Sequence, residues 1–262
     1  MDSPTQSTKF FYPRWPVFHE DNHLLVIYKP ALIPVQRGMR GGESLLDLAK
    51  KWLALRYSKP GRVYLGLVHR LDFPVAGVMV FARTSKAASR LSAQFREGNV
   101  KKTYLAVVEG IPAAPQGTLR HMIARSGKLS RVAHTGEQGS REGVLEYRVI
   151  AQLEKQALVE IDLITGRKHQ IRLQFSDIGH PVLGDSLYGS ASALPAGCIA
   201  LMSRRMVFLH PTRKISMSFQ SPVPAGWPWP EALDGEVIPA PLWTWRQMRK
   251  ESYDMANSGF FL

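Results

Sequence analysis

Asp72 is the residue of this chain whose type and setting best suit chemistry. It lies between two β-prone apolar runs, 65–68 and 77–82, and follows Arg70 by two positions. The Phe-Pro pair after it predicts a turn, so we expect its carboxylate at the lip of a buried strand pair. A partly desolvated carboxylate near a guanidinium can act as a nucleophile or a general base. The same pattern also fits an aspartate that caps a turn or pairs with Arg70.

Two further segments carry side chains that could serve such a carboxylate. Residues 166–172 read Gly-Arg-Lys-His-Gln-Ile-Arg, and residues 179–189 read Gly-His-Pro-Val-Leu-Gly-Asp-Ser-Leu-Tyr-Gly. With His69-Arg70-Leu71-Asp72 before them, in this order, they resemble the RluA-type pseudouridine synthases. Segments 25–30, 102–110 and 208–211 resemble that family's first strand, tyrosine segment and closing strand. The resemblance therefore extends over most of the chain.

The resemblance implies an enzyme that isomerises uridine in RNA to pseudouridine. The N1–C1′ glycosidic bond is broken, the uracil is rotated, and the base is rejoined to the ribose through C5. Asp72 is the implied catalytic acid, which either adds to C1′ of the ribose or removes a proton from C2′. A carboxylate is able to do either. Because the uracil is retained and reused, one carboxylate suffices and we predict no cofactor.

The resemblance also assigns roles to residues around Asp72. Arg172 is implied to pair with the acid and to keep it ionised and oriented. A uridine in a stem must be flipped out to reach a buried acid, and Arg70 is implied to stack where the base was lost. Tyr104 is implied to lie against the target uracil; without the resemblance it would be predicted as a core strand tyrosine.

Arg167 is a candidate site residue with two possible roles. We interpret its segment as a strand, in which residues five apart point to opposite faces, so Arg167 is not expected to share the contacts of Arg172. We assign Arg167 to a phosphate or to support of its loop, and an ordinary solvated arginine is the alternative. His69 and His169 are predicted to be structural hydrogen-bonding residues.

The composition indicates a polyanionic partner. Lys and Arg number 34 against 21 Asp and Glu, which gives a formal net charge of +13 and a pI near 10.0. Nucleic acid is the expected partner, here rRNA or tRNA, although a generically basic protein fits the same balance. The single Cys198 excludes an internal disulfide and a cysteine-based zinc site. Neither a metal-ligand spacing nor a glycine-rich nucleotide-binding motif is present, so we predict no metal and no nucleotide cofactor.

The N-terminal residues are polar, and no apolar run of the sequence is long enough to cross a bilayer. We therefore predict a cytoplasmic protein without a membrane partner, and we expect it to be a monomer.

Strands outnumber helices in the pattern, and they do not alternate regularly with them. We predict an α+β fold: a single catalytic domain on a mixed, mostly antiparallel sheet, with flanking helices and an RNA-binding cleft. Helices are predicted over 44–56, with Ser44 as N-cap, and from Thr84 or Ser85 to residue 95. Residues 127–143 predict a long loop or a loose hairpin. Strands are predicted at 24–28, 65–68, 77–82, 104–109, 144–153, 157–164, 199–207 and 215–219.

Three regions are expected along the chain: a flexible leader over residues 1–16, the catalytic domain over 17–225, and a Trp/Pro-rich C-terminal extension over 226–262. Within the extension, residues 242–250 are predicted to pack on the domain as a helix, with a free RNA-binding arm as the alternative. A catalytically inactive RNA-binding module of the same fold is the competing function. The joint presence of Asp72, Tyr104 and Arg172 favours the enzyme, since a module that only binds would need the basic surface alone.

Overall fold

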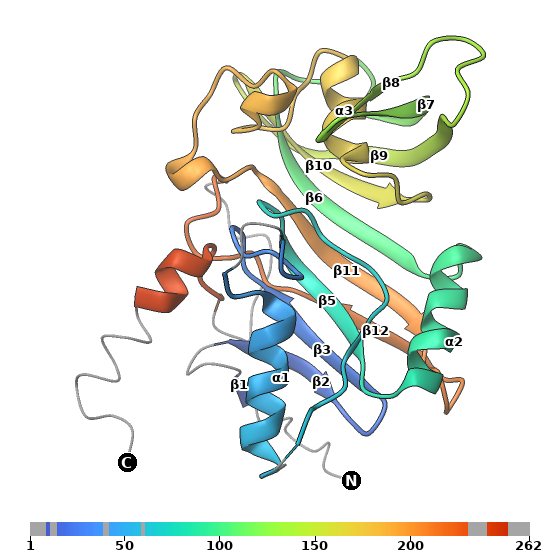
Figure 1. The fold of residues 1–262 in the computed structure, drawn as a ribbon. Helices are drawn as coiled ribbons and strands as arrows, with labels where there is room; N and C mark the ends of the chain where they lie inside the picture. Colours follow the sequence, from blue (N-terminus) through green and yellow to red (C-terminus); the bar gives the residue numbers. More distant parts are fainter. Residues whose placement is uncertain (1–8, 11–14, 39–41, 59–60, 230–239, 251–262) are drawn as a thin grey trace, which may run out of the picture.

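The computed structural model describes residues 9–10, 15–38, 42–58, 61–229 and 240–250. In this part of the chain a 12-stranded sheet is flanked by helices, which is the predicted α+β architecture (Figure 1). The helices are α1 (Leu45–Arg56), α2 (Ser85–Arg96) and α3 (Gln170–Asp177), with short 3-10 turns η1 (Ser186–Tyr188) and η2 (Pro195–Gly197). The strands are β1 (Lys9–Phe10), β2 (Pro16–Glu20), β3 (Leu24–Lys29), β4 (Gly66–Leu67), β5 (Ala76–Ala82), β6 (Lys101–Glu109), β7 (Gln116–Ser126), β8 (Leu129–Val132), β9 (Arg141–Leu153), β10 (Gln156–Leu163), β11 (Leu201–Leu209) and β12 (Ser216–Gln220).

The sheet is mixed and mostly antiparallel, as predicted. Its order is β1-β2-β3-β5-β11-β6-β10-β9-β7-β8, with β4 beside β5 and β12 beside β11. Among the described strands β5 and β11 run parallel, and the other neighbouring strands are antiparallel. The chain therefore crosses from β5 through α2 and β6–β10 before β11 returns to the middle of the sheet.

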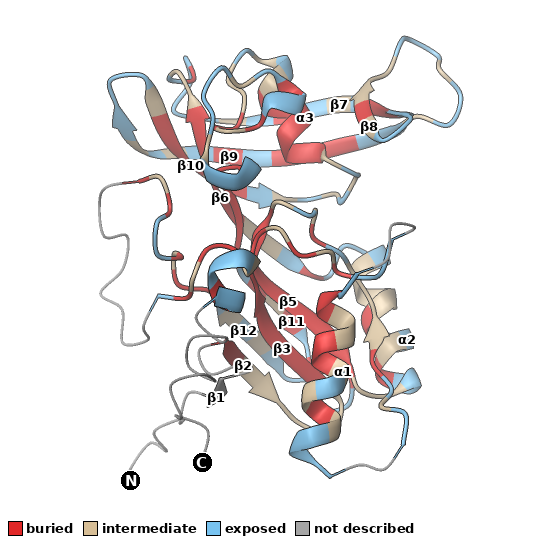
Figure 2. Ribbon diagram, turned by 60° about the vertical axis from the view of Figure 1, so that its left-hand side comes forward, coloured by how far each residue is buried: buried red, intermediate tan, exposed pale blue. Residues whose placement is uncertain are grey.

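Helices cover both faces of the half of the sheet that holds β3, β5 and β11 (Figure 2). Successive residues of a strand point to opposite faces. Accordingly Leu25 and Ile27 of β3 join the large core under α1, while Leu24 and Val26 join a second cluster under α2. Every residue of β5 is buried, which explains why its sequence is a continuous apolar run rather than an alternating one.

Both N-terminal helices begin where their caps predict. The Ser44 side chain accepts a hydrogen bond from the Asp47 backbone, and the Asp47 carboxylate accepts one from the Ser44 backbone, which forms a capping box. Thr84 caps α2 by accepting from the Ala87 backbone. These caps fix the helix starts, and the apolar faces then set how each helix packs.

The other half of the sheet holds β6 to β10 and is covered by α3 (Figure 1). The prediction of a long loop or loose hairpin over 127–143 was partly wrong. A regular hairpin formed by β7 and β8 turns at residues 127–128, and an irregular stretch of 133–140 then leads into β9. Ordered pairing of β7 with both β8 and β9 holds this region against α3.

The described part of the C-terminal region packs on the domain. Trp243 and Met248 belong to the large core, and residues 245–250 are helical. The Trp245 backbone donates to the Ala31 carbonyl, while the Ala31 backbone donates to the Trp243 carbonyl. The predicted terminal helix is thus present over 245–250. The proposed boundaries of the leader and the extension stay predictions, because much of both lies outside the described residues.

Within the described residues, no helix combines the length and apolarity that crossing a bilayer requires.

Candidate active site

Asp72 lies on the turn between β4 and β5, and a buried lysine fixes the backbone of that turn. The ammonium of Lys29 donates to the carbonyls of Pro30 at 3.0 Å, Phe73 at 3.2 Å and Val75 at 2.7 Å. The Leu32 backbone also donates to the Phe73 carbonyl, at 2.8 Å. The Asp72 side chain keeps 30% of its surface exposed, so it is held at a lip that substrate can reach.

Lys29 itself is fully buried. Burial lowers the pKa of its ammonium to about 7, and the nearby charge of Asp72 opposes that shift. Lys29 therefore donates hydrogen bonds to three backbone carbonyls and interacts electrostatically with the Asp72 carboxylate. Lys29 lies in segment 25–30, which resembles the family's first strand, but nothing in that pattern predicts that its side chain supports the Asp72 turn.

Gly77 lets the Asp72 turn approach the middle of the sheet. Its φ is +120°, and a Cβ placed there would lie 2.1 Å from the Ser203 carbonyl oxygen. β5 and β11 pair in parallel at this point, with Gly77 opposite Ser203. A side chain at Gly77 would push the two strands apart directly behind the candidate acid.

Arg172 lies beside Asp72, as the resemblance implied. Its Nη1 is 3.6 Å from Asp72 Oδ2, and its side chain is only 3% exposed. Its tighter bonds go to another acid: Nε and Nη2 donate to the Asp185 carboxylate at 2.5 and 2.7 Å. Asp185 is 1% exposed and so forms a buried bidentate pair with Arg172. The guanidinium is thereby oriented with its remaining nitrogen toward Asp72.

The strand interpretation of residues 167–172 was wrong. Residues 170–177 form α3, and Arg167 lies in the loop before it. The sequence of residues 170–175 alternates polar and apolar side chains, which is typical of a strand, although all six residues are buried in the helix. The expected separation of the two arginines still holds: Arg167 Nε donates to the Glu142 carbonyl at 2.8 Å rather than to Asp72.

A second cation lies close to Arg167. The Lys102 Nζ is within 3.8 Å of the position that a Cβ on Gly166 would take. Burial, and then the charge of Arg167, lower the pKa of Lys102 to about 8. Two cations that repel each other at the edge of the site favour an anion there.

The backbone conformation of His169 places its side chain beside Asp72. It immediately precedes α3 in the left-handed conformation, with φ 54° and ψ 24°. Its Nε2 lies 3.7 Å from Asp72 Oδ2, and its Nδ1 lies 2.9 Å from the Tyr188 hydroxyl. The Tyr188 ring lies under the Arg172 guanidinium, 5.0 Å away. The purely structural role predicted for His169 omits this contact with the candidate acid.

His69, by contrast, is structural as predicted. Its Nε2 accepts from the Val80 backbone at 3.1 Å, and its ring stacks on Phe95 with 4.8 Å between centroids. Burial lowers its pKa to about 3, with a further contribution from Lys102, so the ring is neutral. It ties the Asp72 turn to β5 and α2.

Tyr104 and Arg70 complete the candidate set. Tyr104 lies on β6 with its side chain 8% exposed, and burial followed by the charge of Asp72 raises the pKa of its hydroxyl. Its hydroxyl is therefore neutral and close enough to Asp72 to sense its charge. Arg70 lies two residues before the acid with an exposed side chain. The structure thus brings Asp72, Tyr104 and Arg172 together, while Arg70 is exposed and Arg167 contacts the Glu142 backbone.

Three participants escaped sequence reasoning: Asp185, Tyr188 and Lys29. The first two lie in the Gly-Asp-Ser-Leu-Tyr-Gly run at 184–189, a segment that resembles the family but whose pattern assigns no role to either residue. An acidic residue and an aromatic residue in a turn bounded by glycines indicate that the turn has a defined conformation. The residues that Asp185 and Tyr188 contact depend on how α3 packs, and local sequence pattern does not predict that packing.

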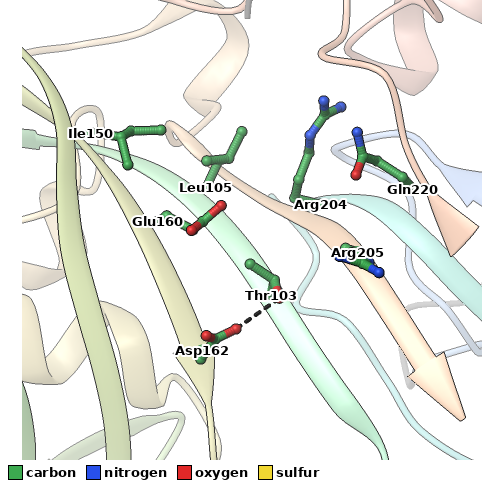
Figure 3. A pocket seen from close by; sticks show the side chains of 8 residues that line it. All are labelled: Thr103, Leu105, Ile150, Glu160, Asp162, Arg204, Arg205 and Gln220. Atoms are coloured by element: carbon green, nitrogen blue, oxygen red, sulfur yellow. Dashed lines mark hydrogen bonds between the residues drawn. The ribbon is translucent and has the colours of Figure 1, made fainter. Parts of the chain in front are cut away.

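A pocket of about 390 Å³ lies elsewhere, on the other face of β6 (Figure 3). Thr103 and Leu105 line it, and they alternate with Tyr104 along the strand. Thr103 donates to Asp162 at 2.7 Å inside it. The pocket is therefore separated from Asp72 by the sheet, and we do not assign the chemistry to it.

The family model that matches this chain and the two relatives described here are all RNA pseudouridine synthases. The family model described as RNA pseudouridylate synthase matches residues 23–177. The chain is 32% identical over 219 residues to ribosomal large subunit pseudouridine synthase D of Zymomonas mobilis, covering 79% of this chain and 69% of that protein. It is 34% identical over 220 residues to an uncharacterised RNA pseudouridine synthase of Bacillus subtilis, covering 82% and 70%.

Solved structures share the fold. The human RNA pseudouridylate synthase domain containing 4 superposes with a TM-score of 0.67 at 24% identity, over 80% of this chain and 88% of that one. The human RNA pseudouridylate synthase domain containing 1 gives 0.65 at 22% identity, over 95% and 98%.

Proposed function

Because the chain belongs to the RNA pseudouridylate synthase family, and within it to the RluA type, we propose that Asp72 is the carboxylate with which it isomerises uridine in RNA. The chain is thus an RNA pseudouridine synthase. The observation that supports the role of Asp72 is its setting. It is the partly exposed acid that Arg172, His169 and Tyr104 surround, on a turn fixed by Lys29.

The proposed chemistry needs an ionised acid that is poorly solvated. Asp72 either attacks C1′ or takes the C2′ proton as the bond to N1 breaks, and both steps require the carboxylate form. The Arg172 guanidinium at 3.6 Å favours that form. The detached uracil then rotates and bonds to C1′ through C5, while Asp72 leaves C1′ or returns the proton to C2′. The C5 proton is lost and N1 gains one, so the product is an isomer of the substrate. Since the base is kept, the reaction consumes no external group, and we propose that no cofactor takes part.

The remaining residues are assigned by position. Tyr104 lies where it can stack on the flipped uracil, because it is on β6 beside the acid. The exposed Arg70 is placed at the rim, where its flat guanidinium can fill the gap left by the flipped base. Arg167, with Lys102 beside it, is assigned to a phosphate of the RNA backbone.

Ribosomal RNA of the large subunit is the substrate that we propose. Support comes from the named relative of Zymomonas mobilis and from the net charge of +13, which suits a polyanion. Transfer RNA is the alternative. A monomer acting in the cytoplasm is part of the same proposal.

The test replaces Asp72 with the nearly isosteric amide. Asp72→Asn should abolish pseudouridine formation and leave thermal stability and RNA affinity near wild type, because the loss is chemical. Release of tritium from uracil C5 of labelled RNA measures turnover in vitro. Mapping pseudouridine in total RNA of a gene-deleted strain, complemented with either protein, identifies the substrate.

Asp162→Asn is the matched control, since this carboxylate lies on the opposite face of the sheet beside Thr103. It should keep wild-type turnover. Near-wild-type turnover of Asp72→Asn would refute the assignment of the acid. A missing modification in tRNA rather than large-subunit rRNA would refute the proposed substrate.

A further inference from the structure

His169 adopts the left-handed backbone conformation, which is uncommon for a residue other than glycine. Histidine takes a positive φ more often than most side chains do, as asparagine and aspartate also do, but the conformation still has to be held by its surroundings. Residue 169 takes it with φ 54°, immediately before the first residue of α3. The loop before it is fixed from both sides, since the Gln170 side chain accepts from Thr165 Oγ1 at 2.7 Å and from the Arg167 backbone at 2.9 Å. The strained residue is therefore held in one orientation.

The Tyr188 hydroxyl fixes the ring of His169. This hydroxyl accepts from the Ser130 backbone amide at 2.9 Å. Its own hydrogen can go either to the Ser130 carbonyl at 3.2 Å or to His169 Nδ1 at 2.9 Å. It therefore donates to Nδ1 of a neutral ring, or accepts from Nδ1 of a protonated ring. In both arrangements the Nε2 of His169 carries a hydrogen. In the remaining arrangement, a neutral ring with its hydrogen on Nδ1, the Nε2 lone pair would face the Asp72 carboxylate at 3.7 Å, and the repulsion between them disfavours it.

Nε2 lies 3.7 Å from Asp72 Oδ2, which is longer than a hydrogen bond but close enough for its N–H to attract the carboxylate. We propose that His169, oriented by the Tyr188 hydroxyl, is a positioning residue that holds the Asp72 carboxylate in its reactive orientation and favours its ionised form. The inference rests on the proposed role of Asp72. It adds a second N–H group to the one that Arg172 presents at 3.6 Å, so that two donors approach the same oxygen.

The charges around His169 support a neutral, donating ring. Burial lowers its pKa, and Arg172 and Lys168 act in the same direction, while Asp72 and Asp185 oppose them. Tyr188 is the remaining titratable neighbour. A neutral ring with its hydrogen on Nε2 gives Asp72 a donor without taking its proton.

Two substitutions at His169 separate positioning from backbone strain. Asparagine suits the left-handed conformation better than glutamine does, but its amide is too short to replace Nε2. If His169 only shapes the backbone, His169→Asn should match or exceed His169→Gln in activity. If it positions Asp72, His169→Gln should retain more activity, because its amide reaches farther.

Single-turnover rates over a range of pH give the decisive readout. We expect His169→Asn to lower the rate about tenfold at neutral pH with little change in RNA affinity. The acidic limb of its pH–rate profile should move to higher pH, because the carboxylate has lost a donor that favours ionisation. Tyr188→Phe keeps the ring under Arg172 but removes the hydroxyl, and should shift the limb in the same direction by less.

His180→Asn is the matched control. Its Nδ1 contacts the Glu109 carbonyl at 2.9 Å, in the segment after α3, and its loss should leave the profile unmoved. A uniform loss at every pH, or Asn at least as active as Gln, would overturn the inference, and thermal unfolding of each variant reports its folding. If Asp72→Asn is active, the proposed function itself is refuted. If Asp72→Asn is inactive and His169→Asn has wild-type activity, only the positioning role is refuted.

Discussion

Arg172 is bound to Asp185 more tightly than to Asp72. Two hydrogen bonds, at 2.5 and 2.7 Å, join the guanidinium to Asp185, while the nearest approach to Asp72 is 3.6 Å. The cation beside the candidate acid is thus fixed before substrate arrives, and Asp72 keeps free lone pairs for chemistry. A pair that neutralised Asp72 completely would instead compete with the substrate for the carboxylate.

Asp185→Asn tests this arrangement without removing the arginine. The amide keeps the shape of the carboxylate but loses its charge and one acceptor, so Arg172 can turn toward Asp72. We expect a rate loss of about tenfold to a hundredfold from misplacement. Single-turnover measurement with saturating enzyme checks it. Arg172→Met is the less informative change, because it would leave Asp185 as an unpaired buried charge and destabilise the fold by about 3–5 kcal/mol.

Tyr104 can be probed by separating its ring from its hydroxyl. If the ring only stacks on uracil, Tyr104→Phe keeps most activity and Tyr104→Leu loses it. We expect instead that Tyr104→Phe binds RNA and opens the glycosidic bond but does not complete the isomer, because the hydroxyl assists loss of the C5 proton. Pseudouridine yield distinguishes the two: full yield in Phe removes the hydroxyl role, and full yield in Leu removes Tyr104 from the site.

Lys29 should make stability depend on pH. Its pKa is about 7 in the folded protein and near 10.5 when unfolded, so the unfolded state binds more protons between these values. The free energy of unfolding of wild type relative to Lys29→Met should therefore rise as pH increases from 7 toward 10.5. Below pH 7 this difference should no longer depend on pH, because Lys29 is protonated in both states. Urea unfolding at a series of pH values checks it. The exposed Lys86→Met is the control and should show no such trend.

Gly77→Ala should be among the most disruptive small changes in the chain. The added methyl would meet the Ser203 carbonyl at 2.1 Å, and the backbone at φ +120° resists a side chain. We expect a loss of at least about 3 kcal/mol in the free energy of unfolding. Gly98→Ala is the control, because its φ is also positive, at +75°, but a Cβ there meets nothing within 4 Å. Equal losses in both would show that only φ matters.

The sequence predicted the fold class because its signals are local. The capping residues Ser44 and Thr84 and the fully apolar β5 segment each report on structure within a few positions. The resemblance placed Asp72, Arg172 and Tyr104 in one site, and the structure brings these residues together. Here the order of motifs along the chain carried the information.

The supports of the site could be seen only in three dimensions. Asp185 binds Arg172, and Lys29 binds the Asp72 turn through Phe73, 44 residues along the chain. His169 lies near Asp72 at the start of α3, a segment that the sequence pattern predicted as a strand. Each contact joins elements whose relative placement follows from burial of the whole core. Sequence pattern determined what chemistry this chain carries, and tertiary packing decided which neighbours orient it, because a buried polar side chain is satisfied by whatever the fold brings within reach.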